Sequence, residues 1–175
     1  MNKIFIVAAG IFLLGLNTSC STQTYLDKDT VSQVISNQEF TFMAQKANPL
    51  DTSVNNVMNS MPGMTNRILN LDYGYTVKVE KDKLTVNLPY FGRSYTPSYN
   101  STNIGFNFES KDFSIHKAEG KKKSQLLTFN IKDQNTFKKF YLEIFENGRA
   151  YLSIDSNDRQ PISYDGFIMK NEVKN

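Results

Sequence analysis

The chain has 175 residues, a length that fits one domain with a single core. Its 20 basic and 17 acidic residues nearly balance, which argues against nucleic-acid binding, because such proteins concentrate positive charge on one face. The presence of one histidine and one cysteine excludes metal sites built on two imidazoles and a disulfide bond within one molecule. We therefore expect no metal, no cofactor and no nucleic-acid partner.

The first residues have the composition of an export signal. Lys3 is followed by thirteen apolar or glycine residues, Ile4 to Leu16. A positive charge, a short apolar run and small residues before a cleavage point describe a secretory leader. The run is too short to span a bilayer, which needs about 17 to 25 residues. We predict that residues 1–19 are removed as a leader.

The only cysteine, Cys20, follows the small residues Thr18 and Ser19. This pattern resembles the lipobox of bacterial lipoproteins, although Asn17 stands where leucine is usual. The resemblance implies that Cys20 is acylated and anchors the protein in a membrane. Because no aspartate follows the cysteine, it also implies sorting to the outer membrane of the cell envelope, facing the periplasm. Two or three acyl chains hold a protein stably, since each buried methylene contributes about 0.8 kcal/mol.

We expect residues 20–38 to form a tether and one short helix. Within residues 25–37, Val31, Val34 and Ile35 have helical spacing, and acidic residues precede them, as is favourable at a helix start.

Residues 36–39 (SNQE) match a capping box that would begin another helix. Against this, Phe40, Phe42 and Ala44 occupy alternate positions, which is typical of a strand. We predict a strand over residues 39–47, the start of a single β domain covering 39–170.

Residues 48–66 are rich in asparagine, proline and glycine and read as a long connection. Met58, Met61 and Met64 lie three apart in it. Thioethers suit Cu(I), but methionine also fills irregular gaps over a core, and we expect the second role.

After residue 70 apolar and aromatic residues alternate with polar ones in short runs separated by turns, the signal of strands. A hairpin of about 73–80 with 83–88 is followed by runs around Phe106, Phe113, Leu127, Phe140, Leu152 and Ile162. Asn147-Gly148 is a strong hairpin signal. The prediction is a mainly β fold, an antiparallel meander of about eight or nine strands; a curved sheet, a sandwich and a partly open barrel remain open.

The stretch LPYFGRSY, residues 88–95, carries the most concentrated candidate site. Pro89 cannot donate to a strand ladder, so the strand ends or lies at an edge there. Arg93 offers five donors and a flat stacking face. The site would hold an acidic, glycan or peptide ligand; alternatively Arg93 pairs with a carboxylate of the protein itself. The candidate ligand-binding residues are Tyr90, Arg93, Tyr95, Tyr99, Arg159 and Tyr164.

This stretch, together with residues 147–168, resembles the domain-of-unknown-function 4251 family of exported Bacteroidota proteins, over about residues 39–169. The shared marks are Leu88, Pro89, Tyr90, Gly92, Arg93, Asn147, Gly148, Arg159, Tyr164 and Gly166. The resemblance implies an exported, often lipidated, mainly β domain, and it brings no activity, substrate or catalytic residue.

No catalytic set is recognisable. The single histidine, His116, is expected on the polar side of a strand, and no GxSxG motif presents a serine. Five carboxylates in the C-terminal half could supply a glycosidase pair: Glu143, Glu146, Asp155, Asp158 and Asp165. We expect a non-catalytic binding or structural module of the periplasm, with a carboxylate-dependent envelope hydrolase as the alternative.

Lys121, Lys122 and Lys123 cluster at an expected hairpin tip. A solvated turn is the simpler reading, and contact with a membrane surface or an anionic polymer is the alternative.

Overall fold

The computed structural model describes residues 23–50, 60, 68–95, 105–134 and 136–171. Several features of the sequence lie outside these residues, and the structure does not bear on them: the leader, Cys20, Tyr99 and the three spaced methionines Met58, Met61 and Met64.

The predicted helix is confirmed as α2 (Lys28–Asn37). The carboxylate of Asp27 caps it by accepting a 2.9 Å hydrogen bond from the backbone N–H of Thr30. The helix ends at Gln38, which adopts a left-handed conformation with φ 56°. The SNQE segment therefore ends a helix and does not begin one.

The predicted strands are present, and all of them pair antiparallel in one nine-stranded sheet. They are β1 (Phe40–Pro49), β2 (Thr76–Glu80), β3 (Lys83–Leu88), β4 (Phe106–Ser110), β5 (Phe113–Glu119), β6 (Gln125–Ile131), β7 (Phe137–Ile144), β8 (Arg149–Ser156) and β9 (Ile162–Met169). A short 3-10 turn, Lys121–Lys123, lies between β5 and β6.

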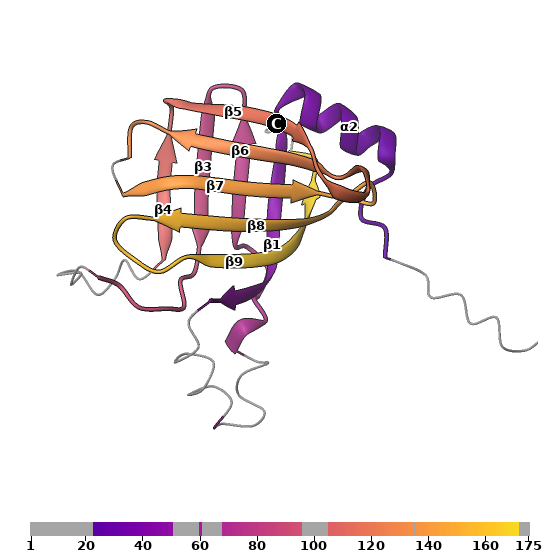
Figure 1. Ribbon diagram of the computed structural model, residues 1–175. Coiled ribbons are helices and arrows are strands. Elements are labelled where there is room, and N and C mark those ends of the chain that lie inside the picture. Colours follow the sequence, from indigo (N-terminus) through magenta and orange to yellow (C-terminus); the bar gives the residue numbers. More distant parts are fainter. Residues whose placement is uncertain (1–22, 51–59, 61–67, 96–104, 135, 172–175) are drawn as a thin grey trace, which may run out of the picture.

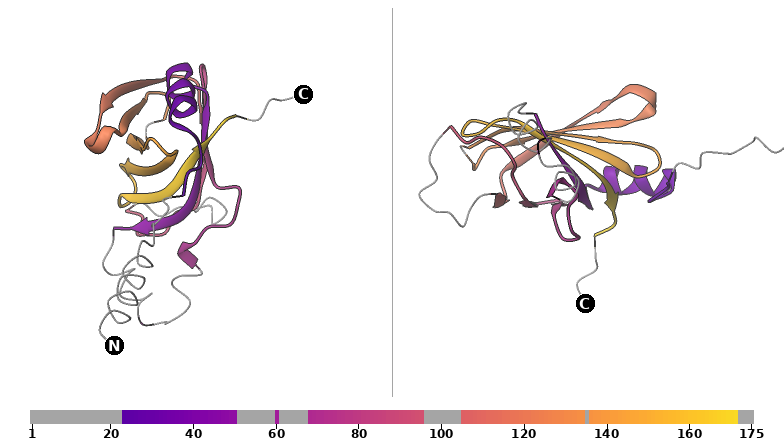
Figure 2. Two further views of the ribbon diagram at one scale, coloured as in Figure 1. Left: turned by 90° about the vertical axis from the view of Figure 1, so that its right-hand side faces the viewer. Right: turned by 90° about the horizontal axis from the view of Figure 1, so that it is seen from below.

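The sheet is curled into a nearly closed barrel, which settles the choice that the sequence left open. The strand order is β4-β3-β2-β1-β9-β8-β7-β6-β5, so the first and last strands of the chain pair at its centre. In Figure 1 β2, β3 and β4 cross β6, β7 and β8 at a steep angle, and Figure 2 shows the two curved halves facing each other. β1 belongs to both halves, and its pairing with β9 shifts register between Ala44 and Lys46, an irregularity that bends a strand.

Alternation along the strands places one face in a common core, as expected. Burial alternates along β2, β3, β6 and β8. Among the described residues, the six largest side chains that are fully buried are all aromatic: Tyr164, Phe40, Phe42, Phe106, Phe129 and Phe140. Val31, Val34 and Ile35 of α2 join the same cluster, so the helix covers one end of the barrel. Within the described residues, no helix is long and apolar enough to cross a membrane.

The two edge strands of the sheet, β4 and β5, are consecutive in the chain, and the turn between them is held by Asp133. The carboxylate of Asp133 accepts hydrogen bonds from the hydroxyl of Ser110 (2.6 Å) and the backbone N–H groups of Lys111 (2.9 Å) and Asp112 (3.3 Å). The bond from Ser110, followed by the one from Lys111, holds the pKa of Asp133 below its ordinary value of 3.8.

Replacing Asp133 with asparagine should lower the melting temperature in a pH-dependent way. Because the pKa of this carboxyl is lower in the folded protein than in the unfolded chain, its stabilising effect is present above about pH 4 and is lost as the pH falls through the folded value. Thermal melts should therefore show a gap between wild type and Asp133→Asn at pH 7 that shrinks below pH 4. Asp112→Asn, which affects only an exposed 3.7 Å pair with Lys132, is the control. A gap independent of pH would contradict the prediction.

Candidate functional site

The candidate site lies at the end of the barrel opposite α2, where β3 gives way to the segment 89–95 (Figure 1). Backbone contacts join this segment to the β8–β9 connection. The backbone N–H of Tyr95 donates to the carbonyl of Asp158 (2.7 Å), and the N–H of Gln160 donates to the carbonyl of Arg93 (3.1 Å). Ser94 and Arg159 form the β-bridge between these two bonds. The structure thus brings together residues 89–95 and residues 157–161, and we call their junction the corner.

Tyr164 fixes the start of this corner from inside the core. Its side chain is fully buried, and its hydroxyl donates a 2.6 Å hydrogen bond to the carbonyl of Pro89. Burial raises the pKa of Tyr164 far above its ordinary value, so the phenol remains a neutral donor. Tyr164 therefore positions the segment and does not face solvent.

Tyr90 is the second buried anchor. Its hydroxyl lies 2.9 Å from the carbonyl oxygen of Arg93 and 3.1 Å from that of Gln160, between the two segments. Burial is the main cause that raises the pKa of Tyr90, with Arg159 acting in the opposite direction. A Cβ at Gly92 would lie 2.5 Å from the hydroxyl of Tyr90, so the ring requires a glycine there.

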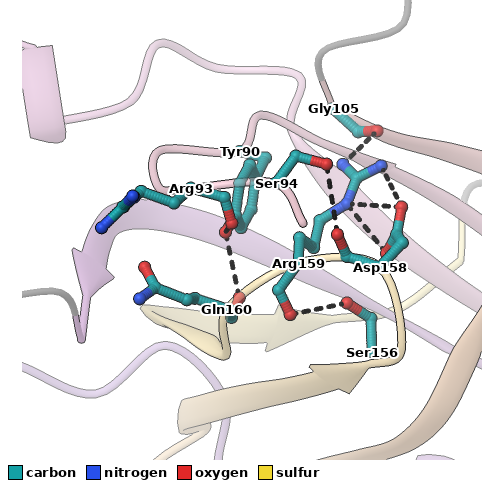
Figure 3. Close-up of polar contacts among 8 residues, drawn as sticks. All are labelled: Tyr90, Arg93, Ser94, Gly105, Ser156, Asp158, Arg159 and Gln160. Carbon is teal, nitrogen blue, oxygen red and sulfur yellow. Dashed lines mark hydrogen bonds and ion pairs between the residues drawn. The ribbon is translucent and has the colours of Figure 1, made fainter. Parts of the chain in front are cut away.

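Arg159 is held inside the corner (Figure 3). Its guanidinium lies 5.0 Å from the ring centroid of Tyr90 and 5.1 Å from that of Phe106, and these two rings meet edge to face. It donates to the carboxylate of Asp158, with Nη2 at 2.8 Å, and to the carbonyl of Gly105 at 3.4 Å. The side chain of Arg159 is only 14% exposed, so this arginine pairs within the fold.

Arg93, in contrast, is exposed. Among the described residues its guanidinium takes part in no hydrogen bond and no ion pair, and in Figure 3 it extends away from Arg159. The side chain of Gln160 extends in the same direction in that view. The oxygen Oε1 of Gln160 is buried and, within the described part of the chain, accepts no hydrogen bond. Tyr95, two positions after Arg93 in the chain, is 65% exposed.

The predicted residues therefore divide into two groups, with Tyr99 outside the described residues. Tyr90, Arg159 and Tyr164 support the corner, whereas Arg93 and Tyr95 are its exposed members. Three further members, Gln160, Asp158 and Phe106, were not indicated by the sequence. Asp158 and Gln160 adjoin the noted Arg159, but no local pattern links them to a segment about seventy positions earlier.

Two of the carboxylates considered for a hydrolase, Glu143 and Asp165, line the same hollow, whereas Glu146, Asp155 and Asp158 do not line it. Four of the five bind different partners: Glu143 the hydroxyl of Ser124, Glu146 the amino group of Lys28, Asp158 the guanidinium of Arg159 and Asp165 the amide of Asn48. His116 is exposed on β5, as expected. Among the described residues no three histidine, cysteine or acidic side chains are grouped so that they could hold a metal ion.

A family model covers residues 23–168 of this sequence, and its description is domain of unknown function, DUF4251. The chain belongs to this family. The resemblance noted from LPYFGRSY and the C-terminal segment is thus confirmed, and the match also includes α2.

A crystal structure of a DUF4251 family protein from Bacteroides eggerthii is similar in fold. The two proteins share 14% sequence identity with a TM-score of 0.52, and the match covers 84% of this chain and 89% of the other. At this identity the likeness concerns the fold alone. A comparison with curated proteins gives no match.

The two arginines of the corner should differ sharply in their effect on stability. Arg159→Ala removes a stacked cation and leaves the carboxylate of Asp158 without its partner, and we expect it to lower the free energy of unfolding by about 3 kcal/mol. Arg93→Ala, the matched control, should change it by no more than about 0.5 kcal/mol, as for a surface residue. Urea unfolding of both variants measures this. Equal losses would contradict the division of the corner into supporting and exposed residues.

Proposed function

We propose that this protein is a lipid-anchored module of the cell envelope that binds ligands and does not transform them. In this proposal the leader directs export, Cys20 is acylated, and the domain lies in the periplasm on the outer membrane. The lipobox-like sequence before Cys20 supports the anchor. Four of the five carboxylates considered for a hydrolase are bound to other groups of the protein, so the binding role is the one we favour.

The observation that carries the binding role is that the exposed guanidinium of Arg93 and the side chain of Gln160 extend in the same direction (Figure 3). An exposed guanidinium is a strong partner for a carboxylate, because charge-assisted hydrogen bonds are about twice as strong as neutral ones. Next to it, Oε1 of Gln160 is an acceptor that is already removed from solvent and accepts no hydrogen bond from the described residues. A ligand with a carboxylate and a neighbouring N–H or O–H group would satisfy both. The C-terminus of a peptide and an acidic sugar both have this chemistry.

Tyr95 adds an aromatic surface to these two groups, because its side chain is 65% exposed. The backbone beneath is rigidly connected through the hydrogen bonds of Tyr95 and Gln160 to the opposite segment. Pre-organised groups of this kind bind with a smaller loss of conformational entropy than mobile ones.

Binding should depend on the ligand's carboxylate and on Arg93. We would titrate short peptides with free or amidated C-termini, and uronic-acid or neutral oligosaccharides, by calorimetry. Arg93→Ala should weaken carboxylate binding about tenfold or more, the loss expected for a charge-assisted hydrogen bond. The control is Arg149→Ala, whose side chain is 60% exposed and lies elsewhere on the barrel. No preference for carboxylates, or an equal effect of the two substitutions, would refute this role.

Gln160→Met should separate binding from stability. Methionine has a similar length and lacks the buried oxygen, which accepts no hydrogen bond from the described residues. The free energy of unfolding should therefore be unchanged or slightly higher. The same change should weaken binding of the ligands that require Arg93. A large loss of stability would show that Oε1 has a structural partner.

The lipid anchor has its own test. Cys20→Ala should leave the protein uncleaved or soluble, because acylation of this thiol is the proposed attachment. Detergent partitioning and the mass of the N-terminal peptide measure the outcome. A variant that is cleaved before position 20 and still partitions into the detergent phase like wild type would rule out the anchor.

A further inference from the structure

The chain becomes fastened to the barrel only a few residues after Cys20. The side-chain amide of Asn147, in the β7–β8 turn, donates to the carbonyl of Gln23 (3.0 Å), and the backbone N–H of Tyr25 donates to the carbonyl of Asn147 (2.9 Å). The ring of Tyr25 stacks on that of Phe167 at 4.3 Å. A Cβ at Gly148 would lie 2.9 Å from the backbone nitrogen of Leu26, which shows how closely the segment is packed.

This attachment leaves little freedom between the anchor and the domain. Gln23 lies three positions after Cys20, and an extended chain spans at most about 3.6 Å per residue, so the reach is about 11 Å. The headgroup layer on one side of a bilayer is itself several ångströms thick. An acylated Cys20 would thus hold the Asn147–Gly148 turn at the headgroups, with no room for the domain to turn its other end to the membrane.

The same end of the barrel carries the lysine turn between β5 and β6. In Figure 1 this turn, the β7–β8 turn and the start of α2 lie together on the right-hand side. Lys122, Asn147 and Arg149 line one hollow of about 570 Å³. Lys123 and Lys28 line a second hollow with Glu146. The cations are therefore next to the point at which the tether leaves the domain.

Two of the carboxylates at this end are bound to other groups, while Glu119 lines the second hollow with Lys123. Glu146 pairs with Lys28 at 2.7 Å, and Glu143 accepts a 2.6 Å hydrogen bond from the hydroxyl of Ser124. The ion pairs among the described residues include none of Lys121, Lys122 and Lys123, and all three are exposed.

The backbone of this turn is unusual for lysine. Lys122 and Lys123 have φ of 54° and 61°, a left-handed region that glycine and asparagine enter more easily. Ser124 holds the turn: its N–H donates to the carbonyl of Lys121 (3.1 Å), and its hydroxyl oxygen lies 2.8 Å from the same carbonyl oxygen. Lysine is thus present at two positions where the backbone favours other residues, which points to a role for the side chains.

We propose that this end of the barrel docks on anionic lipid headgroups, with Lys121, Lys122 and Lys123 as the contacts, and that the Arg93 corner faces away from the membrane. The inference rests on the proposed acylation of Cys20. A tether of this length keeps the lysine side chains within about one Debye length of the membrane surface. At that distance salt does not fully screen their electrostatic attraction to anionic lipids.

The test uses the full-length protein in vesicles with a quencher attached to the lipid headgroups. Because Cys20 is the only cysteine, a second cysteine is the only free thiol once Cys20 is acylated, and it can carry a fluorophore. We would compare Lys122→Cys with Asp112→Cys. Asp112 lies at the other end of β5, which is about 20 Å long, and its side chain is 65% exposed.

We expect most of the fluorescence at position 122 to be quenched and little at position 112. Quenching at 122 should be stronger on phosphatidylglycerol-containing vesicles than on phosphatidylcholine alone. Adding Lys121→Gln and Lys123→Gln should reduce that difference, whereas Lys111→Gln with Lys132→Gln, near position 112, should not.

The outcomes separate this inference from the lipid anchor. Acylated protein, verified by the mass of the N-terminal peptide, that shows equal quenching at the two positions, or equal quenching on neutral and anionic vesicles, would overturn the docking surface alone. An unmodified Cys20 with no quenching at either position would overturn both proposals.

Discussion

The constraint on which the rest of the structure depends is that β4 and β5 are adjacent in the chain but occupy opposite ends of the strand order. Only two residues, Lys111 and Asp112, join them, so the sheet has to curl until its edges approach. The carboxylate of Asp133 accepts hydrogen bonds from this short turn and so stabilises the arrangement in which the two edge strands lie close together. Curling in turn encloses the aromatic side chains, and one interior serves all nine strands.

A barrel of this kind has two ends, and they are built differently. At one end α2 covers the core with Val31, Val34 and Ile35, and the amino group of Lys117 donates to the carbonyl of Ile35 near the end of the helix. At the other end the corner is made from stacked and hydrogen-bonded side chains around Arg159. The first end carries the attachment of the chain. The second carries the exposed groups proposed to bind a ligand, so the two proposed roles need not interfere.

The sequence predicted the elements well because their signals are local. Alternation marked the strands, and Asn147-Gly148 marked a hairpin whose Gly148 indeed has φ of 80°. The barrel could not be predicted, since the bend of β1 arises from an irregularity at Ala44 and Lys46 that alternation on either side does not reveal. The roles of the two arginines were also hidden. Arg93 and Arg159 are chemically identical, and only the pairing of distant segments buries one beneath Asp158 and leaves the other exposed.

The pairing of β1 with β9 also determines when the protein can finish folding. Thr41 at one end of this ladder hydrogen bonds to Asn171, 130 positions later, so the ring of strands cannot close until nearly the whole chain is available. Until then β1 has β2 as its only neighbour in the sheet and offers an unpaired edge that carries Phe42 and Ala44. Contacts between such distant residues make folding slow, because the long loop must close before they form. During that interval the unpaired edge of β1 can pair with other chains. It is covered only when β9, within the last ten residues of the domain, pairs with it.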